Sequence, residues 1–169
     1  MATLENYFHE TELGYLGGGL DWSPFRHDDV LQECMVVDVR CNVIDSIVGI
    51  IVDRRTGLDE IGGDTGLMVL EGVSRLDWTG SATVGRPYSR SIMSHRMTVD
   101  GDRLAVRFHV QKAVLDIGFR RGYYHEGDVI DLDQAQPDLT EWRSPYPKNG
   151  FQEWGSEFRI VGSDAIAVV

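Results

Sequence analysis

Basic residues and long apolar runs are both scarce in this sequence. Sixteen Lys and Arg residues stand against 27 Asp and Glu residues, which gives a formal net charge of -11. Binding to a nucleic-acid backbone requires a basic surface, so we expect neither DNA nor RNA as a partner. The same charge disfavours anionic membrane surfaces. No apolar stretch approaches the ~20 residues that span a bilayer, and we therefore expect a soluble protein without a membrane partner.

Cysteine is almost absent, with only Cys34 and Cys41. Both fall in one apolar region, and we interpret them as buried thiols of a protein from a reducing compartment. The N-terminal residues lack a basic segment followed by an apolar run, which is the pattern of a signal peptide. Together these features predict a cytoplasmic protein.

Metal-binding and catalytic motifs are missing as well. The five histidines form no His-x-His pair and the cysteines form no Cys-x-x-Cys pair, so we predict no metal and no cofactor. In the run His27-Asp28-Asp29 a carboxylate stands next to an imidazole and could orient it as a general base. No Ser or Cys nucleophile can be assigned to it, so we name no catalytic residue. The sequence leaves open whether the protein is an enzyme and favours the view that it is not.

The clearest pattern present is a strict alternation over residues 103–111. Its even positions, from Leu104 to Val110, are all apolar, and its odd positions are polar except for Ala105. A period of two is typical of a strand with one buried and one solvated face. The preceding Asp100-Gly101 predicts a hairpin, because both residue types tolerate a positive φ.

Other runs predict further strands around this one. In 91–99 the side chains of Met93, His95, Met97 and Val99 are expected to share a face. The remaining expected strands are 33–39, 43–52, 67–73 with 74–78 continuing it, 113–120, 123–132, and a closing hairpin of 157–161 with 165–169.

Short strands without a long helical pattern predict a mainly β fold. We expect an antiparallel β-sandwich or a partly open barrel of about eight strands with few short helices. A chain of 169 residues is expected to form a single domain over residues 1–169. Residues 1–20 end in a run of glycines and are expected to form a flexible Gly-rich N-terminal arm.

Two segments combine the residue types of protein contact surfaces. Residues 120–128 carry two arginines, two tyrosines, a histidine and two carboxylates, and we expect them on an exposed hairpin. Tyrosine and arginine are enriched at interfaces. The second segment follows Trp22 and is acidic. The candidate partner-binding residues are Trp22, Asp28, Asp29, Tyr123, Tyr124 and Glu126.

An alternative site lies on the polar face of 103–111. His109 stands beside Arg107 there, and His95 lies on the neighbouring expected strand. If the register places the two histidines opposite each other, this face is a polar floor. In a closed barrel the same face would line a ligand cavity. The alternative function is therefore a small-molecule-binding β-barrel or an enzyme with a pocket of His95, Arg107 and His109.

Residues 22–31, Trp-Ser-Pro-Phe-Arg-His-Asp-Asp-Val-Leu, resemble the opening of small bacterial immunity proteins that neutralise polymorphic toxins. Residues 70–76, Leu-Glu-Gly-Val-Ser-Arg-Leu, are similar to a later element of the same proteins. The resemblance implies a non-enzymatic cytosolic binder with an acidic surface. The charge argues for the same function independently, because complementary charge speeds association with a basic protein. We therefore expect an acidic binding protein, of immunity type, that sequesters a basic protein partner; the sequence does not indicate the oligomeric state.

Overall fold

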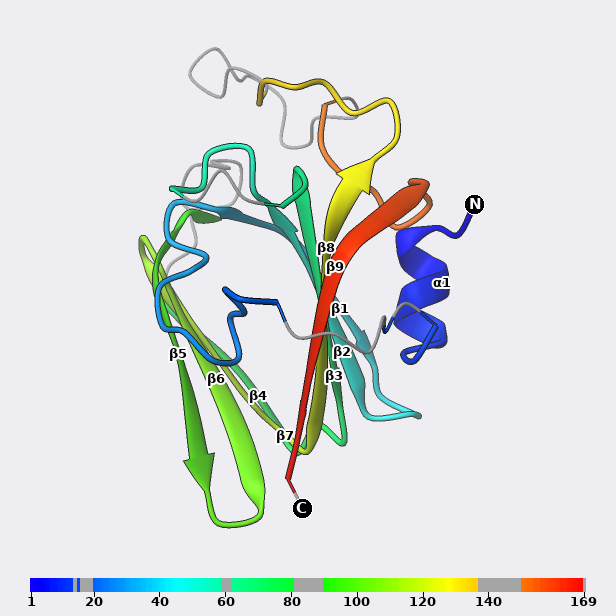
Figure 1. Ribbon diagram of the computed structural model, residues 1–169. Helices are drawn as coiled ribbons and strands as arrows, with labels where there is room; N and C mark the ends of the chain where they lie inside the picture. The colour runs from blue at the N-terminus through cyan, green and yellow to red at the C-terminus, as the bar shows by residue number, and fades with distance from the viewer. Residues whose placement is uncertain (14, 16–19, 59–61, 81–89, 137–149, 169) are drawn as a thin grey trace.

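The computed structural model describes residues 1–13, 15, 20–58, 62–80, 90–136 and 150–168, and these form two antiparallel sheets (Figure 1). The five-stranded sheet has the order β1-β2-β3-β8-β9, and the four-stranded sheet has the order β4-β7-β6-β5. The mainly β prediction is confirmed, with nine strands among the described residues and no closed barrel formed by them. The elements are α1 (Leu4–His9), β1 (Met35–Asn42), β2 (Ile47–Asp53), β3 (Thr65–Glu71), β4 (Arg75–Gly80), β5 (Ile92–Asp100), β6 (Arg103–Val110), β7 (Ala113–Phe119), β8 (Arg121–Val129) and β9 (Phe158–Ala167).

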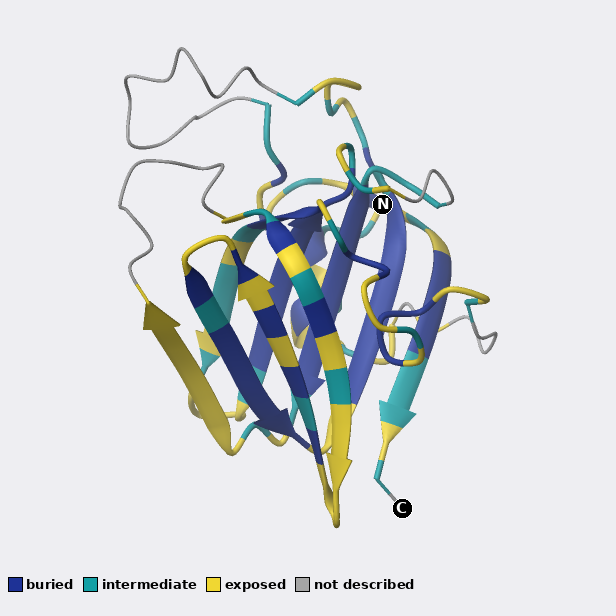
Figure 2. Cartoon of the chain, turned by 90° about the vertical axis from the view of Figure 1, so that its left-hand side faces the viewer, coloured by how far each residue is buried: buried dark blue, intermediate teal, exposed yellow. Residues whose placement is uncertain are grey.

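The alternation of residues 103–111 places one face of β6 in the core between the sheets. Leu104, Val106, Phe108 and Val110 are between 0% and 4% exposed. Figure 2 shows buried and exposed residues alternating along this strand. They pack with residues of the other sheet such as Ile50 and Met68 in one apolar cluster. The predicted hairpin is also confirmed, since Asp100 pairs with Arg103 and Gly101 has a φ of 61°.

The outer face of the five-stranded sheet is covered by α1 and by residues near Trp154. Leu4 and Phe8 of the helix pack with Ile51, Leu67 and Val69 in a second apolar cluster. Strands β2 and β3 are therefore buried on both faces, as their nearly continuous apolar sequences require.

Parts of three expectations are wrong. Residues 4–9 of the expected flexible arm form α1, which begins with a capping box between Thr3 and Asn6; the glycines at 17–19 lie outside the described residues. Val43 and Ile44, expected at the start of a strand, are 81% and 94% exposed in the turn between β1 and β2. Cys41 lies exposed on β1, whereas Cys34 is buried as expected.

The C-terminal hairpin expected at 157–161 and 165–169 is wrong, because β9 runs through Gly162 as one strand and pairs with β8. A Cβ atom at Gly162 would lie 2.2 Å from the Leu20 side chain. This glycine therefore allows a close contact within the strand rather than a turn. It lies next to a register shift between Glu126 and Gly127 of β8.

The shared face expected for residues 91–99 is broken by a β-bulge. The register of β5 shifts between Ile92 and Ser94, so that Ile92 and His95 point inward. Only Met93 leaves the expected face and is 53% exposed; His95, Met97 and Val99 share the side that pairs with Phe108, Val106 and Leu104, and Val99 is 68% exposed near the end of the strand. A bulge adds one residue to a strand and reverses the side-chain alternation beyond it.

Residues 20–34 bridge the two sheets. Arg26 binds the Asp164 carboxylate of β9 with Nε 2.9 Å from Oδ2. On the other sheet, the Asp29 backbone N–H donates to the His95 carbonyl of β5, and the Glu33 N–H donates to the Ile92 carbonyl. The segment is thereby held against the start of β5. No helix in the described part of the chain is long and apolar enough to cross a membrane.

We expect Phe108→Ala to lower the free energy of unfolding by about 3–5 kcal/mol, because a fully buried ring leaves a cavity. Denaturant unfolding followed by circular dichroism measures this change. Arg103→Ala, an exposed position on the same strand, should change it by less than about 0.5 kcal/mol. Equal effects of the two substitutions would contradict the assigned orientation of β6.

Candidate functional site

Three of the six candidate contact residues are buried within β8. Tyr123, Tyr124 and Glu126 are 5%, 1% and 6% exposed, and β8 is an interior strand between β3 and β9. The expectation of an exposed hairpin over 120–128 is therefore wrong. Both faces of β8 are covered, one by the core between the sheets and the other by the N-terminal residues.

Glu126 is buried because Arg54 forms an ion pair with it. Arg54 Nη1 lies 2.5 Å from Glu126 Oε2, and the two side chains are 4% and 8% exposed. Burial raises the pKa of Glu126, although Arg54 opposes this effect. A Cβ atom at Gly62 would lie 2.4 Å from Glu126 Oε1, so the carboxylate is enclosed by backbone. These contacts give Glu126 a structural role.

The other three candidates lie at the surface on residues 21–29, which we call the acidic segment. Trp22 is 56% exposed, and its ring meets the His27 ring edge-on at a centroid distance of 5.0 Å. Asp28 and Asp29 are both exposed. Asp28 Oδ2 lies 3.3 Å from Arg96 Nε of β5. The segment is thus fixed to the sandwich while Trp22 and its acidic side chains face outward.

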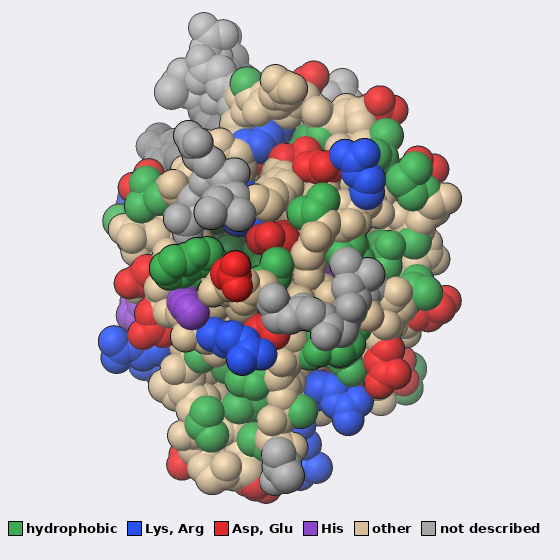
Figure 3. All heavy atoms as spheres, in the orientation of Figure 1, with side chains coloured by type: hydrophobic (Ala, Val, Ile, Leu, Met, Phe, Trp, Pro, Cys, Tyr) green, Lys and Arg blue, Asp and Glu red, His purple; other side chains and the backbone are tan. Residues whose placement is uncertain are grey.

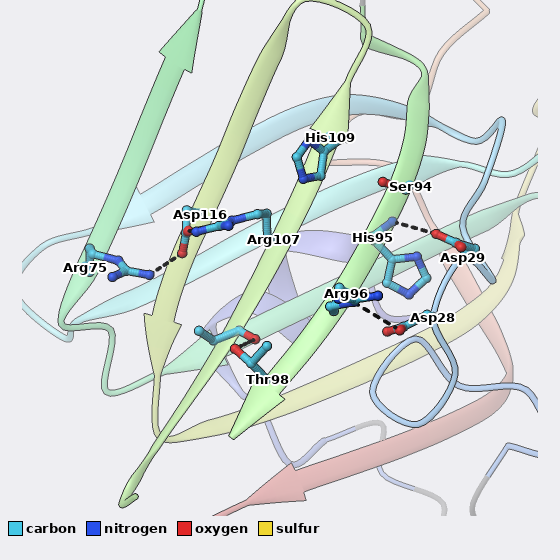
Figure 4. Close-up of a pocket in the computed structure, with 11 residues that line it drawn as sticks. Asp28, Asp29, Arg75, Ser94, His95, Arg96, Thr98, Arg107, His109 and Asp116 are labelled. Carbon is cyan, nitrogen blue, oxygen red and sulfur yellow. Dashed lines mark hydrogen bonds and ion pairs between the residues drawn. The ribbon is translucent and has the colours of Figure 1, made fainter. Parts of the chain in front are cut away.

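A groove of about 390 Å³ lies on the outer face of the four-stranded sheet (Figure 4). Its floor is formed by Ser94, Thr98, Ala105 and His109 of β5 and β6. One side is formed by Arg75, Arg107 and Asp116, and the opposite side by Asp28, Asp29, His95 and Arg96. The groove therefore contains the three predicted pocket residues His95, Arg107 and His109, together with Asp28 and Asp29.

Asp116 organises the first side of the groove. Its carboxylate accepts hydrogen bonds from both Arg75 and Arg107, with Arg107 Nε 2.8 Å from Oδ2. Partial burial raises the pKa of Asp116, but the hydrogen bonds from Arg107 and Arg75 outweigh it and lower the pKa below its usual value. Asp116 is thus held as a carboxylate on which two guanidinium groups converge.

His95 occupies the opposite side in a different way. Ser94, rather than His95, pairs with His109, so the register does not place the two histidines opposite each other. The bulge in β5 turns His95 inward, where its ring stacks on Phe108 at a centroid distance of 6.0 Å. Burial lowers the pKa of His95, against the raising effects of the backbone at Pro24 and of Asp29. Its backbone N–H donates to Asp29 Oδ1 at 3.1 Å.

Several residues of the groove were not predicted from the sequence. The sequence does show polar residues at alternate positions of 94–98. However, the bulge at residue 93 decides which face of the strand they lie on, and the sequence does not reveal the bulge. Asp116 and Arg75 come from strands 41 residues apart in sequence, and only the sheet order brings them together. The missed residues are Arg75, Ser94, Arg96, Thr98, Ala105 and Asp116.

Among the described residues, no group of three or more His, Cys, Asp or Glu side chains is arranged to hold a metal ion. The chain matches no protein-family model, and comparisons with curated proteins and with solved structures found no match. The resemblance to immunity proteins over residues 21–80 therefore stays a prediction.

His125 is a buried histidine without a role in the groove. It is 0% exposed, and its ring lies 5.8 Å from the Tyr7 ring of α1. Neither ring nitrogen has a hydrogen-bond partner within the described chain. Burial lowers the pKa of His125 to about 4. The folded protein therefore holds a neutral imidazole where the unfolded chain takes up a proton near pH 6.5.

We expect this burial to make the protein less stable as the pH falls. The unfolded state binds the proton first, so stability is lost from about pH 6.5 down to the folded pKa of about 4. Between pH 7 and pH 5 the loss due to this group is about 2 kcal/mol. Urea unfolding at both pH values measures it, and in His125→Phe the additional loss should disappear. Tyr7, whose pKa is raised by burial, does not titrate in this range.

An NMR titration of the His125 ring in the wild-type protein provides a second measurement. A folded pKa near 6.5, or the same pH dependence in the wild type and the variant, would contradict the prediction.

Proposed function

We propose that this chain is a non-enzymatic acidic binding protein that sequesters a basic protein partner, in the manner of an immunity-type inhibitor. The acidic segment is the proposed contact surface. The observation that carries the proposal is the exposed Trp22 on the same segment as three exposed aspartates, in a chain with a net charge of -11.

The distribution of charge supports a basic partner. Most described arginines already pair with carboxylates of the same chain, as Arg26 does with Asp164 and Arg40 with Glu5. The excess of acidic residues is consequently left at the surface, and Figure 3 shows acidic side chains spread over one face with fewer basic ones between them. Such a surface attracts a basic protein and speeds its association.

The geometry of the acidic segment supports a specific contact within this general attraction. Asp21, Asp28 and Asp29 are exposed on the same segment as Trp22. An exposed tryptophan supplies a large apolar contact area and binds the cationic side chain of a partner over its ring. The ion pair of Arg26 with Asp164 and the backbone bond of Asp29 to His95 hold the segment in place before binding, which reduces the entropy cost of association.

For the alternative function, binding of a small molecule, the site lies in a different place from the one expected. The described strands form two sheets rather than a closed barrel, so the pocket of His95, Arg107 and His109 is a groove outside the sheet. It is a different surface from Trp22, although Asp28 and Asp29 belong to both.

We expect Trp22→Ala to weaken binding of the basic partner by at least about 30-fold, corresponding to about 2 kcal/mol for an interface anchor. A comparative capture from the native host's lysate, with wild type and variant, identifies the basic protein that only the wild type retains. Calorimetry with that purified protein then measures the affinity. Raising the salt concentration should weaken binding further, since screening acts on exposed charge pairs.

Asp102→Asn tests whether any exposed carboxylate affects binding, because it removes one in the turn after β5, outside the acidic segment. It should leave the affinity within about twofold. Binding that is insensitive to salt, or equal affinities of the wild type and Trp22→Ala, would refute the proposed surface.

A further inference from the structure

We propose that β4 is the pairing edge of a symmetric dimer, in which β4 of a second copy of this chain extends the four-stranded sheet. The two β4 strands would run antiparallel, with Leu76 of one copy opposite Leu76 of the other. This surface lies apart from the acidic segment, so the proposal does not depend on the binding of a basic protein.

Strand β4 is exposed along its whole length. All six of its residues, 75–80, are exposed, and it is the outermost strand of its sheet, next to β7. Figure 2 shows it as the exposed arrow at the left edge of the sandwich. Among the described residues, none outside β7 forms a backbone hydrogen bond with it. The N–H and C=O groups of such an edge are a template for a further strand.

The other three edge strands are each protected over part of their length. Arg90 Nη1 donates to the Val37 carbonyl of β1 at 3.1 Å. Residues 29–34 bind the start of β5, and residues 2–4 pair with the start of β9. The described part of the chain gives β4 no such protection. Pairing through one open edge closes after two copies and produces a dimer rather than a filament.

The inner face of β4 is an apolar edge of the core. Leu76 stands opposite Ile117, and Trp78 stands opposite Leu115; both partners are buried. Opposed residues of antiparallel strands share a face of the sheet, so Leu76 and Trp78 point toward the core. They are nevertheless 39% and 41% exposed, because no described strand lies beyond them. A strand added to β4 would cover both side chains.

The outer face of β4 carries one charge of each sign. Arg75 Nε lies 3.6 Å from Asp77 Oδ2, and Arg75 also binds Asp116 of β7. The Arg75 and Asp77 side chains are 51% and 58% exposed, so both are accessible to an added strand. The sequence Arg-Leu-Asp at 75–77 thus has opposite charges on either side of Leu76.

Symmetry leaves few registers for two copies of this strand. Opposed side chains share a face, so the two-fold axis must pass between equivalent residues of the two strands. An axis at Arg75 sets arginine against arginine, and an axis at Asp77 sets aspartate against aspartate. Like charges at opposed positions are destabilising. An axis at Leu76 instead sets Arg75 of each copy against Asp77 of the other.

The register centred on Leu76 also brings the apolar side chains together. Leu76 meets its equivalent, and Trp78 stands opposite Ser74 of the second copy and diagonal to that copy's Leu76. Aromatic side chains reach such diagonal neighbours. An axis at Trp78 would leave Asp77 opposite Thr79, without a charged partner. The charges therefore select the register, and the segment that complements β4 in both charge and apolar surface is β4 itself.

Sedimentation velocity of the full chain tests for the dimer. Protein at about 10–500 µM in about 0.15 M salt is suitable, because a Debye length of about 8 Å screens the repulsion between two chains of net charge -11. We expect a reversible monomer–dimer equilibrium with a dissociation constant below about 200 µM. A monomer at every concentration, or assemblies that grow beyond the dimer, would overturn the proposal.

Two charge reversals test the register. Arg75→Glu and Asp77→Arg each set like charges against each other, and each alone should weaken dimerisation at least about tenfold. An equimolar mixture of the two variants should restore the dimer, because every opposed pair then joins an acidic and a basic side chain. Wild-type dimerisation of either variant alone, or a mixture of folded variants that stays monomeric, would contradict the register.

Circular dichroism melting shows whether each variant is folded. Arg75→Glu removes a contact with Asp116, whereas Asp77→Arg leaves that contact intact. Asp77→Arg therefore decides the result alone if Arg75→Glu does not fold. With an axis at Asp77 or at Trp78, reversing this charge would not weaken the dimer.

Two further substitutions locate the contact. Trp78→Ala should weaken dimerisation at least about tenfold, whereas Met93→Ala, at a 53% exposed position of the edge strand β5, should leave it unchanged. Equal affinities of the two variants would refute the role of β4. Trp22→Ala should dimerise as the wild type does even where it loses the basic protein. Failure of the dimer and failure of the acidic segment are thereby distinguished.

Discussion

Burial of both faces of the central strands governs this structure. Strands β2 and β3 are apolar on each side, and a sheet with such strands is stable only when both of its faces are removed from water. The four-stranded sheet covers one face, and α1 with the residues around Trp154 covers the other. In the described part of the chain, the apolar core covers the inner face of the four-stranded sheet, and the outer face carries the charged groove. The asymmetry between the two sheets thus decides where a site can form.

The sequence predicts the apolar part of this arrangement well. The alternation around Phe108 and the Asp100-Gly101 turn are local signals, and both are reproduced in β6 and its hairpin. β8 could not be predicted in the same way, since its tyrosines, histidine and glutamate are types usually found at surfaces. Their burial depends on partners distant in sequence; Arg54 lies 72 residues from Glu126. No local pattern contains that information.

The exposed residues of the acidic segment could be predicted from the sequence, whereas the groove could not. Trp22, Asp28 and Asp29 follow a proline-containing turn, and surface exposure is the ordinary state of such a segment. The groove depends on which residues of β5 and β6 are opposed, and one bulge residue at position 93 decides that. A shift of one residue moves every side chain beyond it to the other face. The polar residues were visible in the sequence, whereas their grouping required the register.

The contact between the two ends of the described chain has a consequence for the order of folding. Leu4 N–H donates to the Ser156 carbonyl, and Phe158 N–H donates to the Ala2 carbonyl, so α1 packs on residues synthesised about 150 positions later. A helix of six residues has no stability of its own in water. During translation α1 can therefore complete its packing only after β9 has left the ribosome. Loop closure between such distant segments is slow, and until it occurs the outer face of β2 and β3 is exposed to other chains and to chaperones.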